Sequence, residues 1–319
     1  MSPKARIWLV VGAVALAAAG GTVGATLLTR TEPPSSTAAL PKRKGPPELD
    51  LDLGVRTDRE ATALRRALDL YDHGHAKQAG AIFSRYGSLE AEIGASLATW
   101  PNGFDRLAAL AREHPASSLA QLELGLAFFW QGRVAQAESA WTKSAKLQPD
   151  TLYAVRAGDF LHPADAPGLP PFSPSFDAPR QLAGLTSPQQ FAFLRARAQT
   201  GGAHGKLLYG AALQKLGRPL SARREFAAAA ALAPNDANAQ VAAAVGLFDK
   251  TRPAVAFSRL GPLVKRFPHA VTVRFHLGLM LLWIGQLQAA KAQLEKVVAA
   301  GPSPFLADTR LLLAKLPRK

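Results

Sequence analysis

The residue types that commonly carry catalysis are present in this sequence, but their spacing favours no active site. His73 and His75 flank Gly74, and two imidazoles beside a glycine are more typical of a polar turn than of a metal site. Three carboxylates occur at spacings typical of a helix surface: Glu90, Glu92 and Glu113. The sequence has no HExxH, Gly-x-Ser-x-Gly or P-loop motif and no cysteine, so it lacks the common hydrolase, nucleotide and thiolate sites. We therefore expect no enzyme and neither a cofactor nor a metal.

The charge of the chain is strongly positive. Lysine and arginine number 38 against 23 acidic residues, a formal net charge of +15, which permits attraction to anionic lipid or cell-wall polymer. The alternative is that these charges only keep an alanine-rich protein soluble. Nucleic acid is not an expected partner, and the richness in alanine, arginine and glycine is typical of a bacterial gene. Much of the basic excess falls on predicted outer helix faces: Lys143, Lys146, Arg223, Arg224, Lys265, Arg266, Lys291 and Lys296.

The N-terminal region predicts a single membrane anchor. Residues Ile7–Leu28 carry no charge over 22 positions, and a helix of that length spans about 33 Å, enough for a bilayer core. A cleaved signal peptide is the alternative, with Ile7–Ala19 as its apolar run. Because the apolar run continues to Leu28, longer than a signal peptide needs, we favour an uncleaved transmembrane helix.

The short basic N-terminus, residues 1–6, sets the expected orientation. Lys4 and Arg6 favour a cytoplasmic N-terminus, which places the remainder of a single-pass membrane protein outside the cytoplasm. The opposite orientation stays open, because Lys42, Arg43 and Lys44 lie on the other side of the span. Residues 29–57 are rich in proline and poor in large apolar residues, so they predict a disordered linker.

A repeat of 34 residues runs through the C-terminal half. Pro234, Pro268 and Pro302 are each 34 residues apart. Each unit keeps a small residue at position 8, leucine at 11, a turn residue at 15, alanine at 20 and a bulky apolar residue at 24. The three sets are Gly210, Leu213, Gly217, Ala222 and Phe226; Ala244, Leu247, Thr251, Ala256 and Leu260; and Gly278, Leu281, Gly285, Ala290 and Leu294. A fixed period of this length is typical of stacked helical hairpins.

These units resemble the tetratricopeptide repeat (TPR). The resemblance covers roughly Arg59–Leu316, strongly in four units, one of which is Ser118–Thr151. It implies an all-α solenoid of helical hairpins in a right-handed superhelix, whose first helices line a concave groove that holds protein partners. The resemblance does not imply catalysis. The lysine and asparagine clamp of the chaperone-binding members is absent, because position 5 is apolar: Leu122, Leu207, Val241 and Phe275.

The repeats divide the chain into parts. TPR-like repeats are expected over 58–151, three further repeats over 203–304, and a cap helix with a tail over 305–319. Residues 152–202 form an interrupted repeat, because six prolines between Pro163 and Pro179 forbid a continuous helix. Ser187 is the predicted N-cap of the helix that follows, with Pro188 at its first position. We expect the small residues at positions 8 and 20 of each unit, such as Gly278 and Ala290, to face each other where its two helices cross.

In TPR proteins, positions 2, 5, 9, 12 and 13 of each unit line the groove. By that resemblance the partner-binding groove of this chain comprises Leu119, Leu122, Leu126, Phe129, Trp130, Leu207, Val241, Phe248, Phe275, Leu279, Leu282 and Trp283. An exposed apolar stripe of this size would be a binding surface. The alternative is that neighbouring helices or the proline-rich insertion cover these side chains, which then belong to the core.

The sequence thus supports two functions. The first is a membrane-anchored TPR scaffold or chaperone-like module that binds an unidentified protein or peptide through its groove. The alternative is a binder of anionic cell-wall polymer or lipid through the basic outer face. A further hypothesis concerns the extended segment Gly168–Phe176, whose Phe172 or Phe176 is predicted to dock against Leu122, Leu126, Phe129 and Trp130. A mobile surface loop is the alternative for that segment.

Overall fold

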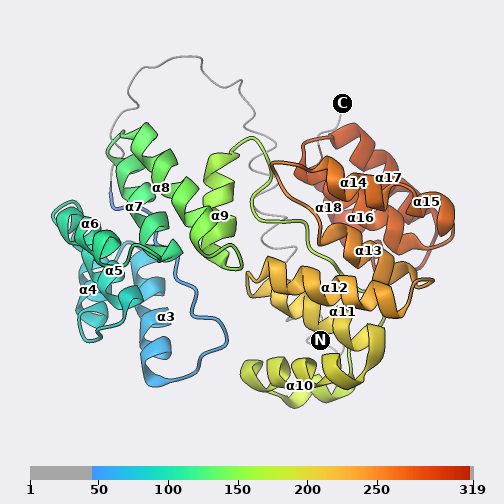
Figure 1. Cartoon of the computed structure of the whole chain (residues 1–319), viewed down its shortest axis with the longest axis horizontal. Coiled ribbons are helices and arrows are strands. Elements are labelled where there is room, and N and C mark those ends of the chain that lie inside the picture. The colour runs from blue at the N-terminus through green and yellow to red at the C-terminus, as the bar shows by residue number, and fades with distance from the viewer. Residues whose placement is uncertain (1–44, 317–319) are drawn as a thin grey trace. The chain divides into compact units, whose positions relative to one another are not determined.

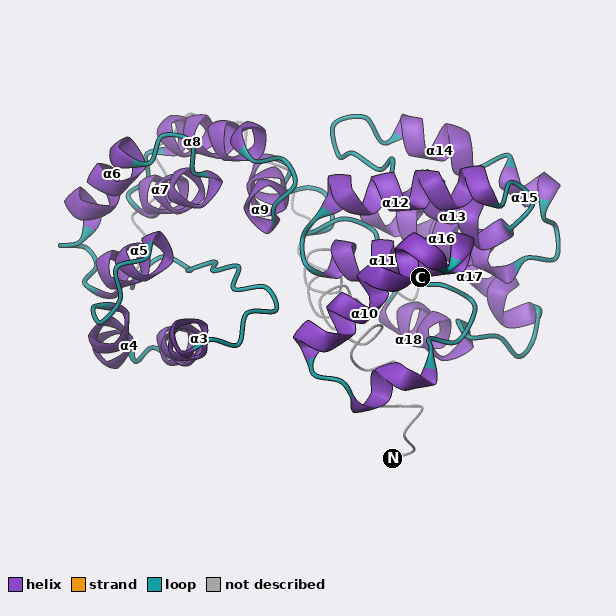
Figure 2. Cartoon of the chain, turned by 60° about the horizontal axis from the view of Figure 1, so that its bottom comes forward, coloured by secondary structure: helices purple, strands orange, loops and turns teal. Residues whose placement is uncertain are grey.

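The computed structural model describes residues 45–316, in which helices alternate with turns and extended loops and no strand occurs (Figure 2). The chain divides into two compact units. Their described parts are residues 45–161, here the N-terminal lobe, and residues 162–316, here the C-terminal lobe. The predicted membrane span, Ile7–Leu28, lies outside the described residues. Within residues 45–316, no helix combines the length and the apolar character that crossing a bilayer requires.

The N-terminal lobe is built from consecutive helices that pack as hairpins, α3 on α4, α5 on α6 and α7 on α8, with α9 closing the lobe against α8 (Figure 1). Their apolar faces meet in one core that includes Leu64, Phe83 and Leu122, all fully buried. The helices are α3 (Arg59–Asp72), α4 (Ala76–Phe83), α5 (Leu89–Ala98), α6 (Phe104–Glu113), α7 (Ser118–Trp130), α8 (Val134–Leu147) and α9 (Leu152–Leu161).

The C-terminal lobe repeats this arrangement around a second core, which includes Phe226, Val241 and Phe275. Its most extensively packed helix pairs are α11 with α12, α10 with α11, and α16 with α17. The elements are the 3-10 helix η1 (Arg180–Gly184), α10 (Ser187–Thr200), α11 (Gly202–Lys215), α12 (Pro219–Leu232), α13 (Ala237–Val245), α14 (Ala254–Leu260), α15 (Leu263–Arg266), α16 (Val271–Trp283), α17 (Leu287–Ala299) and α18 (Leu306–Lys315).

Glycines at position 15 make the turn inside four of the hairpins. Gly74, Gly132, Gly217 and Gly285 have φ of 80°, 77°, 67° and 70°, a left-handed conformation in which a side chain would be strained. Each glycine ends the first helix of its pair and reverses the chain toward the second. The turn at repeat position 15 is therefore set by the backbone freedom of one residue.

The helix crossing differs from the one that the sequence predicts. The glycine at position 8 packs on the bulky residue at position 24, rather than face to face with the alanine at position 20. A Cβ built on Gly125 would lie 2.4 Å from Nε1 of Trp141. One built on Gly278 would lie 2.8 Å from Cδ2 of Leu294, while Ala290 approaches it only with its carbonyl oxygen, at 3.5 Å. The small residue is required because a large side chain of the facing helix fills the space above it.

Two local features of the helices also differ from the sequence predictions. The N-cap of α10 is Thr186, one residue before the predicted Ser187, and the Gln189 side chain accepts the Thr186 N–H at 2.9 Å. The second helix of the unit that begins at Ala237 is broken into α14 and α15 at Gly261. The break occurs because Pro262 has no N–H to continue the helical hydrogen bonds.

The crossing at Gly125 gives a prediction about stability. Gly125→Leu is expected to lower the free energy of unfolding of the N-terminal lobe by about 1–3 kcal/mol, since the new side chain overlaps the buried Trp141 ring. The matched control is Gly158→Leu in α9, where a Cβ would meet no atom within 4 Å. The free energy of unfolding of that variant should be unchanged, or higher by up to about 1 kcal/mol, because leucine has a higher helix propensity than glycine. Urea unfolding followed by circular dichroism measures both, and equal effects would contradict the packing described above.

Candidate functional site

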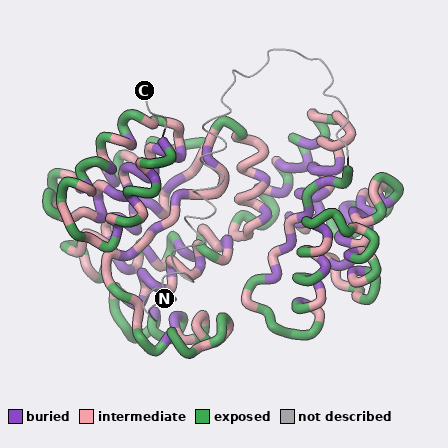
Figure 3. Tube along the Cα trace, turned by 180° about the vertical axis from the view of Figure 1, so that it is seen from behind, coloured by how far each residue is buried: buried purple, intermediate pink, exposed green. Residues whose placement is uncertain are grey.

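The twelve predicted groove residues fall into two sets, five in the N-terminal lobe and seven in the C-terminal lobe. Phe129 and Trp130 are partly exposed. The other ten are buried, with no more than 7% of their surface exposed, and Figure 3 shows buried stretches along the helices that carry them. The predicted groove residues therefore do not form an open apolar stripe. In each lobe an extended segment of the same chain packs into the core that these residues form.

In the C-terminal lobe this segment is Ala166–Phe176, part of the proline-rich insertion, and is visible as the yellow-green trace in Figure 1. Phe172 is 3% exposed, and its ring lies 5.3 Å from the Phe226 ring and 5.2 Å from the His276 ring. Phe176 stacks on His204 with ring centroids 4.2 Å apart. The prediction that Phe172 or Phe176 docks onto the α7 groove is therefore wrong about the location. The segment packs on its own lobe, where its two rings contact aromatic side chains of α11, α12 and α16.

Side chains of three helices accept the backbone N–H groups of this segment. Gln214 Oε1 of α11 accepts from Phe172 N at 2.9 Å. His276 Nε2 of α16 accepts from Ser173 N at 3.0 Å. Asn238 Oδ1 of α13 accepts from Ser175 N at 2.9 Å and from its hydroxyl at the same distance. Because a buried unpaired N–H is costly, these three acceptors allow an extended backbone to lie inside a helical lobe.

The other end of the segment is held by Trp283 and Lys250. The Trp283 carbonyl accepts from Ala166 N at 3.1 Å, and its indole Nε1 donates to the Gly168 carbonyl at 3.2 Å. The Lys250 ammonium donates to the Ala166 carbonyl at 2.7 Å. Trp283, predicted to line a partner groove, thus binds the chain's own insertion.

In the N-terminal lobe the extended segment is Pro46–Leu53. The sequence predicts a disordered linker over 29–57, and for this stretch the prediction is wrong. Leu49, Leu51 and Leu53 are 5%, 9% and 5% exposed and belong to the core that includes Leu119, Leu122 and Leu126. The physical reason is the alternation of leucine with acidic residues, which gives an extended chain one apolar and one charged face.

Three side chains hold the backbone of this segment as well. Glu123 Oε1 of α7 accepts from Asp50 N at 2.9 Å, and the Tyr153 hydroxyl of α9 accepts from Asp52 N at 2.9 Å. The Tyr71 hydroxyl of α3 donates to the Pro47 carbonyl at 2.7 Å. Ordering eight residues costs on the order of 10 kcal/mol, and burying three leucines with three hydrogen bonds returns a similar amount. The net free energy that holds the segment on the lobe is therefore small.

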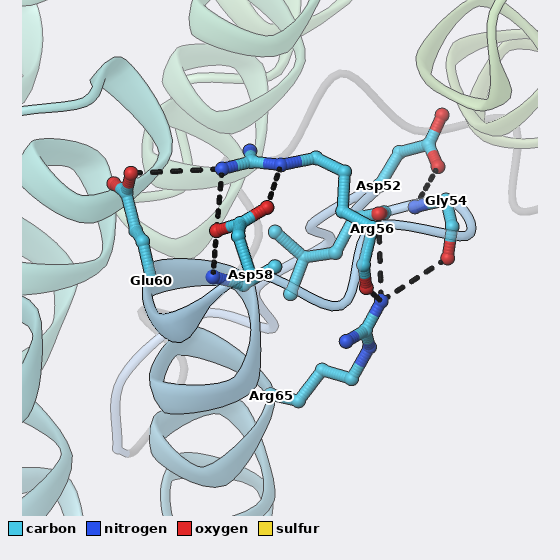
Figure 4. Close-up of polar contacts among 8 residues, drawn as sticks. Asp52, Gly54, Arg56, Asp58, Glu60 and Arg65 are labelled. Atoms are coloured by element: carbon cyan, nitrogen blue, oxygen red, sulfur yellow. Dashed lines mark hydrogen bonds and ion pairs between the residues drawn. The ribbon is translucent and has the colours of Figure 1, made fainter. Parts of the chain in front are cut away.

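A polar cluster fixes the turn between this segment and α3 (Figure 4). Arg65 Nη2 donates to the carbonyls of Gly54 and Arg56, at 3.2 and 2.5 Å. Arg56 in turn donates from Nε to the Asp58 carboxylate at 2.9 Å, and Asp58 caps α3 by accepting from Ala61 N. The C-terminal end of the segment is thus tied directly to the start of the first helix.

The two lobes use the same repeat positions to bind their segments. The repeat units begin at residues 60, 118, 152, 203, 237 and 271. The side chains that bind the segments are then Tyr71 and Gln214 at position 12, Glu123 and His276 at position 6, and Tyr153 and Asn238 at position 2. Sequence reasoning missed position 6. The sequence does contain a signal for this position. Helices α7 and α16 are mainly apolar, yet each has an ionisable side chain at position 6, Glu123 in α7 and His276 in α16.

The two residues at position 6 have perturbed ionisation. Burial lowers the pKa of His276 to about 4, so its ring is neutral near pH 7. Its Nε2 is the acceptor for Ser173 N–H, and its Nδ1 donates to the Thr272 carbonyl at 2.8 Å. Burial raises the pKa of Glu123 well above its usual range, and the neighbouring Asp50 carboxylate adds to this. Glu123 Oε2 has no hydrogen-bond partner within the described part of the chain.

The residues first considered for catalysis are not brought together. His73 is exposed at the end of α3, with Nδ1 2.7 Å from the Asp69 carbonyl, and His75 precedes α4. Glu92 and Glu113 both pair with Arg106 on the surface. Within residues 45–316, no group of three or more histidine, aspartate or glutamate side chains is arranged to hold a metal ion. No protein-family model matches this chain, and no curated protein matches it significantly.

The basic residues of the predicted outer faces are exposed, apart from the half-buried Lys291. Lys143 and Lys146 of α8 line an open pocket of about 660 Å³ together with Arg112, Leu124 and Leu147. A second pocket of about 560 Å³ occupies the same place in the repeat, between the closing Pro268 and α17, and is lined by Arg274 and Lys296. Cations beside apolar residues could contact an anionic group in either pocket.

The buried His276 predicts how the C-terminal lobe responds to acid. The folded lobe keeps this ring neutral while the unfolded chain protonates it, so stability is complete above about pH 6.5 and falls as the pH drops toward 4. The loss over that window is on the order of 3 kcal/mol. His276→Gln keeps an acceptor for Ser173 N–H and should flatten this part of the profile. Urea unfolding between pH 7.5 and 4.5 measures it, and parallel profiles for both proteins would contradict the assignment.

The buried Glu123 predicts the opposite pH response for the N-terminal lobe. Its pKa is raised by burial, so stability is complete below about 4.5 and is lost as the pH rises toward the folded-state pKa. Glu123→Gln keeps the acceptor for Asp50 N–H and removes the charge, so its advantage over the natural chain should grow from pH 4.5 to pH 8. The matched control is the exposed Glu113→Gln, for which no such growth is expected. Thermal melting across this range tests both.

Proposed function

We propose that this chain is a protein-interaction scaffold whose two lobes bind extended peptide segments, and that Ile7–Leu28 anchors it in a membrane. The lobes would be TPR-type repeats, in accordance with the 34-residue spacing of Pro234, Pro268 and Pro302. The positive residues before the span favour an array outside the cytoplasm. The proposal assigns the chain a binding role and no catalytic one.

One observation carries the proposal: each lobe already contains an extended peptide, held through its backbone. In both lobes the acceptors for segment N–H groups stand at positions 6 and 2 of the repeat, here Glu123 and Tyr153 or His276 and Asn238. Backbone hydrogen bonds provide affinity for any extended chain, while pockets for alternate side chains provide selectivity. A groove with these features has what peptide recognition requires.

The resident segments define what kind of peptide each lobe accepts. The C-terminal lobe holds a proline-rich segment with two phenylalanines four residues apart, Phe172 and Phe176. Proline-rich segments lose little conformational entropy on binding, because they are extended before they bind. A partner segment of similar chemistry would exchange with the resident one at little conformational cost.

Binding of anionic polymer or lipid through the outer face is the second candidate. It is favoured by the pocket beside Arg112, Lys143 and Lys146, whose lining contains no acidic residue. We rank it lower, since exposed lysines on a solenoid also serve solubility. The two candidates differ in salt dependence, because binding of a polyanion weakens steeply as salt rises.

The C-terminal lobe provides the test of the scaffold. In the full chain carrying Phe172→Ser and Phe176→Ser, the resident segment loses its two aromatic anchors. A fluorescent peptide with the sequence of residues 166–176 should then bind saturably, and much more weakly to the natural chain, where the site is occupied. Adding Asn238→Ala should weaken binding about tenfold, since one buried N–H loses its acceptor. Fluorescence anisotropy at 50 and 500 mM salt measures this, with similar affinities expected at both.

A matched peptide in which both phenylalanines are serine is the control and should not bind. If the variant chain keeps its helical circular dichroism but binds neither peptide, the scaffold proposal is wrong for this lobe. Capture of a polyanion that is lost at 500 mM salt, without any peptide binding, would favour the outer-face function instead.

A further inference from the structure

The resident segment of the N-terminal lobe has two chemically distinct faces. Leu49, Leu51 and Leu53 point into the core and are nearly inaccessible. The intervening residues, Glu48, Asp50 and Asp52, are acidic and only partly buried or exposed. Because side chains of an extended chain alternate, a shift by one residue would put carboxylates into the apolar core. The sequence of a bound segment is therefore read in a fixed register.

Arg156 on α9 reads the acidic face. Its Nε lies 2.9 Å from Asp50 Oδ2, and its Nη2 lies 3.5 Å from Glu48 Oε2. Asp159, one helical turn away at 3.8 Å, helps to orient the guanidinium, which also lies 5.3 Å from the Phe160 ring centroid. The Arg156 side chain is 27% exposed, so its ion pairs are shielded more than those of a surface arginine. A neutral segment would leave this cation with Asp159 alone.

The resident segment does not satisfy the site completely. Glu123 Oε1 accepts from Asp50 N, but Glu123 Oε2 is fully buried and has no hydrogen-bond partner within the described residues. A buried polar atom without a hydrogen-bond partner weakens the hold on the segment. A segment that brings a hydrogen-bond partner to this oxygen would bind more tightly than the resident one, which makes exchange feasible.

We propose that the groove of the N-terminal lobe is a receptor for extended partner segments that alternate leucine with acidic residues, and that Pro46–Leu53 is a resident copy of that ligand. The leucines enter the core, Arg156 selects acids at the positions of Glu48 and Asp50, and Glu123 and Tyr153 bind the backbone at every second residue. This inference rests on the proposed scaffold function and assigns the partner chemistry of one lobe. A partner must compete with a resident segment that the Arg65 cluster ties to α3. It can displace that segment if its affinity is higher, or if it is tethered nearby and so has a high effective concentration.

The test uses the full chain with Leu49→Ser and Leu51→Ser, which removes the two central anchors of the resident segment. The probe is a fluorescent peptide with the sequence of residues 46–53, Pro-Pro-Glu-Leu-Asp-Leu-Asp-Leu. Its matched control replaces the acids with amides, Pro-Pro-Gln-Leu-Asn-Leu-Asn-Leu. We expect the acidic peptide to bind at least tenfold more tightly than the amide peptide, and at least 100-fold more tightly to this variant than to the natural chain. Adding Arg156→Gln should abolish the preference and leave affinity for the amide peptide within about twofold.

Thermal melting of the same variant gives a second readout that holds if its N-terminal lobe is partly unfolded. A ligand that binds only the folded lobe raises its melting temperature, and the acidic peptide should do so more than the amide peptide. Equal binding or equal stabilisation by both peptides would overturn the acidic selectivity while leaving the scaffold function intact. Absence of binding and of stabilisation by either peptide, while the C-terminal lobe binds its own, would overturn the N-terminal receptor alone.

Discussion

The structure depends on one constraint: the first helices of each lobe carry apolar side chains on the face where a second layer is missing, and water cannot cover that face cheaply. Leu122 and Leu126 in one lobe, and Leu279 and Trp283 in the other, belong to cores that each include an extended segment of the chain. Each lobe satisfies the constraint with an extended piece of its own chain. The extended piece in turn needs acceptors for its N–H groups, because no neighbouring strand provides them.

This second requirement explains why polar residues stand inside apolar helices. Glu123 and His276 are fully buried, and each accepts one N–H of the resident segment. Burial favours the neutral form of both groups, because it raises the pKa of the Glu123 carboxyl and lowers the pKa of the His276 imidazole. A neutral acceptor satisfies an N–H without the cost of burying a charge. Polarity at this position therefore serves the segment and not the helix hairpin.

The two lobes solve the same problem with different chemistry and with opposite chain direction. In the N-terminal lobe Asp50 pairs with α7 and Asp52 with the later helix α9, whereas in the C-terminal lobe Ser173 pairs with α16 and Ser175 with the earlier helix α13. Hydrogen bonds to alternate N–H groups tolerate either direction, because an extended chain presents donors on both edges. The surroundings of the segment side chains differ between the lobes. Aromatic side chains contact Phe172 and Phe176 in one lobe, whereas leucines enter the core and Arg156 pairs with the acids in the other. One repeat geometry thus holds two chemically different segments.

The sequence by itself determined the helical class of the described chain, the hairpin turns at Gly74, Gly132, Gly217 and Gly285, and the interruption after α9, since glycine, proline and the apolar period act locally. The apolar residues at groove positions could also be found, because the 34-residue period places them on one face. Tertiary structure alone decided what covers them. The alternation of Glu48–Leu53 is visible in the sequence, but whether an extended segment packs, and on which lobe, depends on acceptors contributed by helices 42 to 103 residues away. Such long-range pairing leaves no periodic trace, so the linker and the insertion acquire their roles only in the folded chain.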